Sequence, residues 1–212
     1  MKRRQCLAPT WRGCLALALL CVGLAIAAVL EIHPFLAVND PLPGGLLMVE
    51  GWAPDYALEK VVAEVKGGHY EKVYVVGGPL QMGGPLSEYK TYAELGAATL
   101  VKLGLNSNQV QAVPAPEVRQ DRTYAAAVSL RDWLRAHGIS ASKIYLISEG
   151  PHARRSRLLV ERAFGNGVKV GVRSIPSRDY DARHWWRYSA GVRSVVDEAV
   201  AYVYARVFFR AH

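Results

Sequence analysis

The stretch 148–157, SEGPHARRSR, places four basic side chains in the first turns of an expected helix. A helix N-terminus carries partial positive charge and unpaired N–H groups, so it normally attracts acidic residues or a bound anion. At about 100° per residue, His152 and Arg155 fall beside the stripe that would face a sheet, and the other two arginines point into solvent. This pattern predicts an anion site formed by His152 and Arg155, with Glu149 just before the helix. A salt-bridged surface turn is the alternative.

A glycine-rich loop carries a second group of candidate residues. In the segment 77–88, GGPLQMGGPLSE, Gly77 and Gly78 could let backbone N–H groups approach a phosphate. Ser87 would cap the following helix, and Glu88 would lie in its first turn. The spacing matches neither a GxGxxG nor a Walker A loop, so a long turn is the alternative.

The segment 121–123, DRT, opens another expected helix. Asp121 is the expected N-cap, whereas Arg122 and Thr123 are candidate ligand-binding residues. The loop 50–55, EGWAPD, is interpreted as a turn in which Asp55 begins a helix. The sequence contains no serine-hydrolase elbow and no standard zinc motif, so we expect no metal site; the sequence leaves the cofactor unknown.

Short apolar runs alternate with amphipathic segments along residues 44–212. The expected strands cover residues 45–50, 72–76, 110–113, 143–148 and 168–175, and the expected helices cover 54–67, 88–103, 121–137, 151–165 and 192–210. This alternation predicts an α/β fold, a Rossmann-like, doubly wound, mainly parallel five-stranded sheet, preceded by one N-terminal transmembrane helix. Ligands of such sheets bind beyond the carboxyl ends of the strands. The loops after Glu50, Val76, Val113 and Ser148 are therefore the expected site.

The N-terminus has the features of a membrane anchor. Residues 1–12 form a basic tail, and an apolar run without charge follows over residues 13–30. A spanning helix needs roughly 20 apolar residues. We therefore expect a transmembrane signal anchor over 13–36, a proline-rich linker over 37–43, and the α/β domain over 44–212.

Two alternatives to an uncleaved anchor remain. A cleaved signal peptide could use the segment 25–27, AIA, as its cleavage site. A lipoprotein is disfavoured, because Leu20 rather than a small residue precedes Cys21. In each case the basic tail stays in the cytoplasm, so the main domain is expected outside it, at the plasma (inner) membrane with a single membrane pass.

Charge and cysteine content narrow the function further. The net charge of +8 falls to +4 without the four basic residues before the apolar run, which is ordinary for a domain beside an anionic bilayer. No basic run interleaved with aromatic residues occurs, so we expect no nucleic-acid partner. The three cysteines, Cys6, Cys14 and Cys21, precede the domain, which excludes thiol catalysis there.

The loop residues together resemble the SanA/ElyC/YdcF-like family of bacterial domains, which are often tethered by one membrane helix. The likeness covers about residues 44–210. It rests on the following matches: Gly77 and Gly78 with the family's glycine pair, Ser87-Glu88 with its Ser-Glu, Thr123 with its threonine, and His152 and Arg155 with its His-x-x-Arg. The chain departs from the family at Ala125 and Ala126, where Glu and Asn are common, and in its first loop, 49–58.

The resemblance implies a Rossmann-like fold and a role in envelope and cell-wall precursor maintenance, without an assigned reaction. We therefore expect an extracytoplasmic envelope factor that binds a phosphate-bearing ligand, lipid-linked or nucleotide-like. Arg155, helped by Arg122, would hold the phosphate, and His152 with Glu88 would form an acid/base pair if a reaction occurs. A non-catalytic scaffold with Trp185 and Trp186 in its partner surface is the main alternative. A nucleotide- or S-adenosylmethionine-dependent enzyme is a weaker one.

The closing helix, expected over 192–210, combines an apolar stripe with aromatic and basic residues near its end. Its first half is expected to pack on a face of the sheet. Its last residues, including Phe208 and Arg210, have the composition of a membrane-interface helix. We therefore expect the end of this helix to lie toward the membrane.

Overall fold

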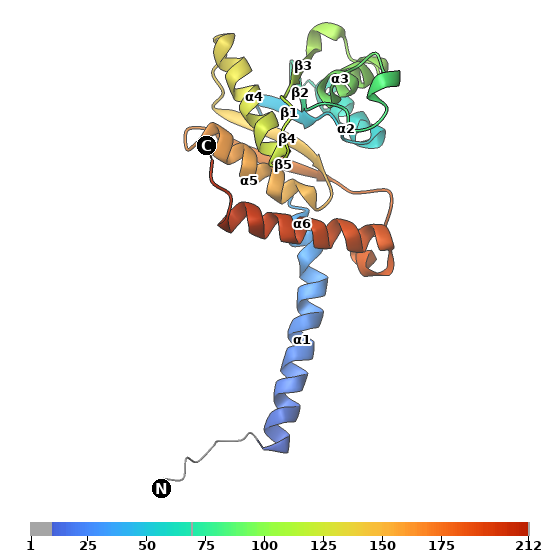
Figure 1. The fold of residues 1–212 in the computed structure, drawn as a ribbon, viewed down its shortest axis with the longest axis vertical. Helices are drawn as coiled ribbons and strands as arrows, with labels where there is room; N and C mark the ends of the chain where they lie inside the picture. Colours follow the sequence, from blue (N-terminus) through green and yellow to red (C-terminus); the bar gives the residue numbers. More distant parts are fainter. Residues whose placement is uncertain (1–9, 69, 212) are drawn as a thin grey trace.

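The computed structural model, which describes residues 10–68 and 70–211, consists of a helical stem and an α/β head (Figure 1). The head is built on a five-stranded, all-parallel sheet with the strand order β3-β2-β1-β4-β5. The strands are β1 (Leu46–Glu50), β2 (Val73–Gly77), β3 (Val110–Pro114), β4 (Lys143–Glu149) and β5 (Lys169–Ile175). The predicted α/β fold with a Rossmann-like parallel sheet is confirmed.

Helices cover both faces of this sheet, as they do in Figure 1. The helices are α1 (Trp11–Leu36), α2 (Asp55–Lys66), α3 (Tyr92–Lys102), α4 (Arg122–Ala136), α5 (His152–Phe164) and α6 (Ser189–Val207), with short 3₁₀ helices η1 (Gly84–Leu86), η2 (Ser107–Gln109) and η3 (Ala182–Arg187). Side chains alternate along each strand. Leu47 and Val49 of β1 therefore pack in the core under α2 and α3, and Met48 packs in the core under α4 and α5.

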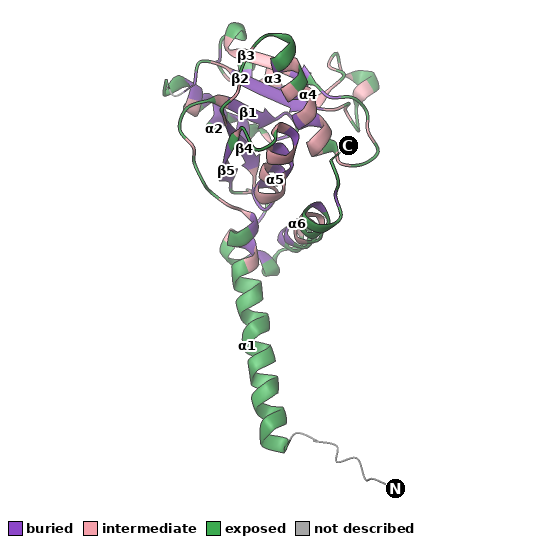
Figure 2. Ribbon diagram, turned by 90° about the vertical axis from the view of Figure 1, so that its left-hand side faces the viewer, coloured by how far each residue is buried: buried purple, intermediate pink, exposed green. Residues whose placement is uncertain are grey.

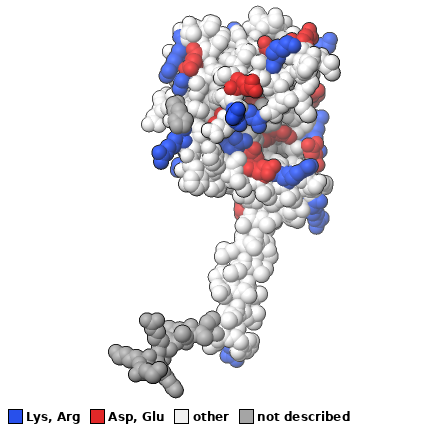
Figure 3. Space-filling model, viewed as in Figure 1, with Lys and Arg blue, Asp and Glu red and all other residues white. Residues whose placement is uncertain are grey.

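The stem α1 is long and apolar enough to cross a membrane. It spans 26 residues, and none of its most apolar 18-residue window is buried in the head. Figure 2 shows this length of α1 as exposed, and Figure 3 shows it as almost free of charged side chains, whereas both signs of charge are mixed over the visible face of the head. The helix begins at Trp11, two residues before the predicted anchor; residues 1–9 of the predicted basic tail lie outside the described residues.

The last turns of α1 belong to the packed head. Leu36 is fully buried, and it packs with Tyr180, Trp185 and Val195. The indole Nε1 of Trp185 donates a hydrogen bond of 3.0 Å to the backbone oxygen of Val29. The stem is therefore fixed to η3 and α6 by a small apolar core.

The predicted linker over 37–43 is not a free tether. Asp40 forms an antiparallel bridge with Val172 of β5, and the side-chain oxygen of Asn39 accepts a hydrogen bond from the Ser174 N–H at 3.0 Å. Leu42 passes so close to Gly171 that a Cβ added there would lie 2.3 Å from the Leu42 Cβ. Residues 39–42 thus run along the edge of β5, which the proline content of the segment did not indicate.

One predicted helix start is wrong, and one predicted N-cap residue makes no cap hydrogen bond. The helix predicted over 88–103 begins at Tyr92, because Thr91 and Glu94 form a capping box there. Asp121 precedes α4 as predicted but makes no side-chain cap hydrogen bond, and its φ of 55° is the left-handed conformation. Asp121 is the one such non-glycine residue among those described.

The closing helix also differs from its prediction. α6 begins three residues earlier than expected and packs on α5, on η3 and on the end of α1 rather than on a face of the sheet. Its buried residues are Gly191, Val195 and Ala205. After Val207 the chain turns back toward the head, where Phe209 is buried against Tyr124 and Leu159.

Candidate functional site

A buried carboxylate ends the central strand. Glu50 is the last residue of β1, and only 3% of it is exposed. Its Oε2 accepts a hydrogen bond of 2.7 Å from the Ser148 hydroxyl, and its Oε1 accepts one of 3.1 Å from Ser156. The Oε1 atom also lies 3.1 Å from Nε2 of His152. Because β1 lies between β2 and β4, the point where the chain reverses its direction across the sheet falls between Glu50 and Ser148, where ligands of such sheets bind.

A second carboxylate comes from α6. His152 Nδ1 lies 2.7 Å from Oε1 of Glu198, and Arg155 binds both carboxylate oxygens of Glu198, with Nε–Oε2 and Nη2–Oε1 distances of 2.8 and 2.9 Å. Arg155 Nη2 is also 2.9 Å from His152 Nδ1, so Glu198 holds two neighbouring cations. The ion network Glu50–His152–Glu198–Arg155 therefore joins β1, α5 and α6.

The network fixes the charge of its members. Burial lowers the pKa of His152, but the charge of Glu50 and the hydrogen bonds to Glu198 and Glu50 outweigh it and raise the pKa to about 9. Burial raises the pKa of Glu198, but the hydrogen bonds from Arg155 and His152 outweigh it and lower the pKa to about 2. In the same way His152 and Ser148 keep the pKa of Glu50 below its usual value despite burial. With this pKa His152 is protonated at neutral pH, with Nδ1 facing Glu198 and Nε2 facing Glu50.

A pocket of about 190 Å³ opens beside this network. It is lined by Trp52, Glu149, Gly150, Pro151, His152, Ser177, Ser194 and Glu198. The indole of Trp52 meets the His152 ring edge to face, with centroids 4.9 Å apart, and Tyr56 donates a hydrogen bond to Glu149. The pocket thus places a partly exposed aromatic ring, two serine residues, His152 and the carboxylates of Glu149 and Glu198 within reach of one small ligand.

The basic residues of the stretch 148–157 all have partners. The two arginines that the sequence placed in solvent instead connect the head to the stem. Arg154 donates to the backbone oxygen of Phe35 at the end of α1, and its guanidinium lies 4.0 Å from the Phe35 ring centroid. Arg157 binds Asp40 at 2.7 Å and Glu161 at 2.9 Å. The cations at the start of α5 therefore pair with the end of α1, with Asp40 and Glu161, and with Glu198.

The glycine pair has different surroundings from those predicted. A Cβ on Gly77 would lie 2.7 Å from the Tyr92 Cβ and 2.9 Å from the Ala93 nitrogen. Gly77 therefore lets the start of α3 pack closely on the end of β2. A Cβ on Gly78 would meet only ordinary contacts, at 3.6 Å or more.

The predicted partnership of Glu88 with His152 is not formed. Glu88 is exposed in the segment between η1 and α3, and the hydroxyl of Ser87 accepts a hydrogen bond from the Tyr89 N–H instead of capping a helix. The carboxylates that contact His152 are Glu50 and Glu198. Glu149 lies at the pocket as predicted.

Arg122 and Thr123 lie at the start of α4, in the same layer as α5. Within the described residues neither side chain has a hydrogen bond or an ion pair. Their neighbour Asp121 does influence the site: its charge is one of several that raise the pKa of Arg155, chiefly those of Glu198, against the opposing effect of burial. The structure therefore brings His152, Arg155 and Glu149 together and leaves Glu88 apart.

Sequence reasoning missed Glu50, Trp52 and Glu198. Glu50 had a usable signal, because an acidic residue that ends an apolar strand at the expected site needs a buried partner. Glu198 had none, since its position depends on how α6 packs against α5. No protein-family model and no curated protein matches the chain. The resemblance to the SanA/ElyC/YdcF-like family stays a prediction.

Proposed function

We propose that this protein is a single-pass, membrane-anchored binding protein of the cell envelope, which takes a phosphate-bearing ligand at the pocket beside His152. The observation that carries the proposal is the Glu198 carboxylate, which His152 and Arg155 hold at the first turn of α5. An imidazolium, a guanidinium and a helix N-terminus together make a site for an anion. An incoming phosphate would compete with Glu198 for these two cations.

The stem supports the proposed location. α1 is long and apolar enough to cross a membrane, and four basic residues, at positions 2, 3, 4 and 12, precede its apolar run in the sequence. Basic flanks stay in the cytoplasm, so the head lies on the opposite side of the plasma (inner) membrane. The resemblance to the SanA/ElyC/YdcF-like family supports a role in envelope maintenance, with a ligand that is free or lipid-linked.

Binding fits the site better than acid/base catalysis by His152. With a pKa of about 9, the ring is already protonated at neutral pH, and both of its nitrogens lie within hydrogen-bond distance of carboxylates. It therefore acts as a cation rather than as a base. A nucleotide- or S-adenosylmethionine-dependent enzyme gains no support from the glycine loop, because Gly77 is closed off by α3.

A non-catalytic scaffold is the second candidate, and a specific observation favours it. The four charged groups of the network satisfy one another, and no buried side-chain nitrogen or oxygen of the described residues lacks a partner. In a scaffold the network would only hold α6 against α5 and the sheet, and Trp186 of η3 would contribute to a partner surface.

The deciding experiment is calorimetric titration of the full chain in lipid nanodiscs. In one arm, inorganic phosphate is titrated into the protein, which tests for a free ligand. The other arm compares nanodiscs with and without a polyprenyl phosphate lipid, which tests for a lipid-linked ligand. A charge-assisted hydrogen bond contributes about 1.5–3 kcal/mol, so Arg155→Gln should weaken binding roughly tenfold or more. Glu198→Gln should strengthen it by removing the competing carboxylate.

Arg157→Gln is the matched control, since Arg157 lies on the same helix but pairs with Asp40 and Glu161. It should bind as the wild type does. Equal affinity of the wild type and a folded Arg155→Gln would refute the anion site. Absence of binding in both arms would favour the scaffold.

A further inference from the structure

α6 carries an exposed apolar stripe that no described part of the chain covers. The stripe consists of Val192, Val196, Val200, Val203 and Val207, whose exposed fractions run from 39% to 66%. At about 100° per residue these five valines fall within an arc of about 80°. Glu198 and the buried Val195 lie on other sides of the helix, toward the pocket and the head. An apolar helix face of this length needs a partner.

The position of α6 along the stem identifies that partner. The apolar run of α1 ends at Leu30, and the exposed Glu31 follows. Trp185, four residues before α6, binds the backbone oxygen of Val29, which is the next-to-last residue of that run. η3 therefore lies at the level where the membrane-spanning part of α1 ends.

From η3, α6 runs crosswise to α1 along the side of the head from which the stem leaves (Figure 1). The helix lies below α5 in this view, and its exposed face is visible at the lower edge of the head in Figure 2. Because the valine stripe lies opposite the face of α6 that packs on α5, it points the same way as the stem, toward the membrane.

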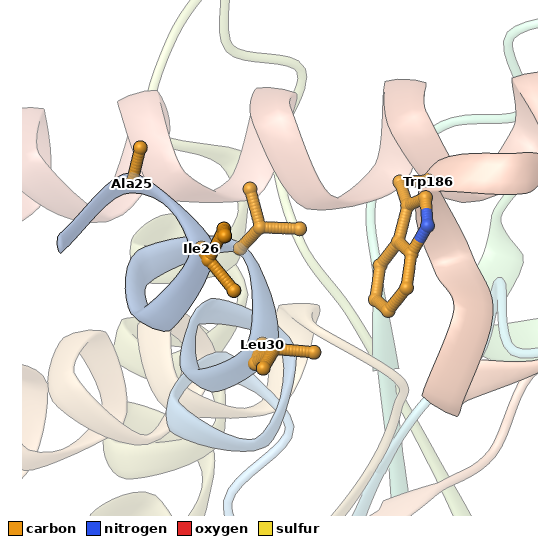
Figure 4. A pocket seen from close by; sticks show the side chains of 5 residues that line it. Ala25, Ile26, Leu30 and Trp186 are labelled. Carbon is orange, nitrogen blue, oxygen red and sulfur yellow. The ribbon is translucent and has the colours of Figure 1, made fainter. Parts of the chain in front are cut away.

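The corner between the stem and η3 is also apolar, as a membrane contact requires. An apolar pocket of about 330 Å³ is lined by Ala25, Ile26, Val29, Leu30 and Trp186. Figure 4 shows the indole of Trp186 facing the length of α1 that carries Ile26 and Leu30. Trp186 is 36% exposed, and tryptophan is the side chain favoured at membrane–water interfaces. A pocket with these walls at this level of the stem is suited to lipid acyl chains.

Cations border the valine stripe. Arg193 and Arg206 are both exposed, and they lie on opposite sides of the stripe, roughly 60–80° from its centre. Arginine in this position can place its charge at the headgroups while its stem lies along apolar surface. The exposed Asp197 lies farther from the centre of the stripe, about 100° away.

We infer that α6 lies flat on the bilayer surface beside the exit of α1, with its valine stripe buried at the boundary between headgroups and acyl chains. This differs from the sequence-based expectation, which concerned the last residues of the helix: the membrane contact lies along the valine stripe, whereas the chain after Val207 turns back toward the head. The inference is independent of the ligand. It makes α6 a layer between the pocket, which Ser194 and Glu198 line, and the membrane.

Spin labelling of the full chain in nanodiscs that contain anionic lipid tests this inference. In a background with Cys6, Cys14 and Cys21 replaced by alanine, a nitroxide is attached at Val200→Cys or at Leu86→Cys. Leu86 is the matched control: it is apolar and 96% exposed, but it lies in η1 on the head. Collisions with oxygen, which concentrates in lipid, are compared with collisions with a water-soluble nickel chelate.

We expect the oxygen-to-nickel accessibility ratio to be several-fold higher at Val200 than at Leu86. Equal, water-like ratios at both positions would overturn the inference. The same spectra test the other occupant of such a face, a second copy of this chain. Dipolar broadening at Val200 that disappears on dilution with unlabelled protein would show that the stripe is a dimer interface, and it too would overturn the inference.

Discussion

His152 of α5 and Glu198 of α6 are joined by an ion pair of 2.7 Å, and His152 also contacts Glu50 at the end of β1, so this pair connects α6 to the sheet. Both side chains are mostly buried, with exposed fractions of 13% and 15%. Removing one partner of a buried pair leaves the other charge unpaired and costs about 3–5 kcal/mol.

Glu198→Gln should therefore lower the free energy of unfolding of the head by about 3–5 kcal/mol, because His152 and Arg155 lose their shared carboxylate. Denaturant unfolding of the full chain in detergent, followed by near-ultraviolet circular dichroism, measures this. Asp197→Asn is the control, since Asp197 is exposed on the same helix and should cost less than about 0.5 kcal/mol. Equal costs for the two variants would show that the network contributes no stability.

The loss of stability at acid pH should depend on the protonation of Glu198. The pKa of Glu198 is lowered to about 2 from a usual value of 4.5, so its contribution is fully present above about pH 4.5 and is lost as the pH falls toward 2. A shift of this size corresponds to about 3 kcal/mol. Unfolding measured between pH 6 and pH 2.5 should show this loss in the wild type and a smaller loss in Glu198→Gln. Parallel curves would contradict the assignment.

His152 should behave in the opposite sense. Its pKa is raised to about 9, so the stability it contributes is fully present below about pH 6.5 and is lost as the pH rises through 9. Nitrogen NMR of histidine-labelled protein should show a doubly protonated His152 ring at pH 7.5, and Glu198→Gln should lower its titration midpoint. His184 is a control on the surface, where it pairs with Asp181. A neutral His152 ring at pH 7.5 would remove the cation that the proposed phosphate site needs.

The sheet and its strand ends could be predicted from the sequence, because buried strands of a parallel sheet read as uninterrupted apolar runs. The tertiary contacts of charged residues could not. Helical periodicity placed Arg154 and Arg157 in solvent, but the end of α1 and residues 39–42 return to that face of α5 and bind them. Glu198 could not be assigned to the site either. The valines of α6 have the same spacing whether they are exposed or face the sheet, so the sequence does not show which side of the helix Glu198 occupies.

The glycine loop shows the same limit, and it provides a paired test. Gly77→Ala should destabilise the head by about 1–3 kcal/mol, because the new methyl group would overlap Tyr92 and Ala93. Gly78→Ala should change stability by less than about 0.5 kcal/mol, since its nearest contact would be 3.6 Å away. Thermal unfolding compares the two. If Gly78→Ala changed ligand binding without changing stability, the glycine loop would be part of the site.

The last prediction concerns the joint between the stem and the head. Leu36 is fully buried between Tyr180, Trp185 and Val195, so Leu36→Ala should open a cavity there and cost the head about 2–5 kcal/mol. The control is Leu24→Ala, which removes the same atoms from the same helix at a position that is 61% exposed in its long apolar part. It should leave the unfolding of the head unchanged. If both variants unfold as the wild type does, α1 is an independent anchor. If only Leu36→Ala is destabilised, the final turns of α1 are part of the core of the head. A version of the head that begins after residue 36 then lacks the side chain that fills the space between Tyr180, Trp185 and Val195.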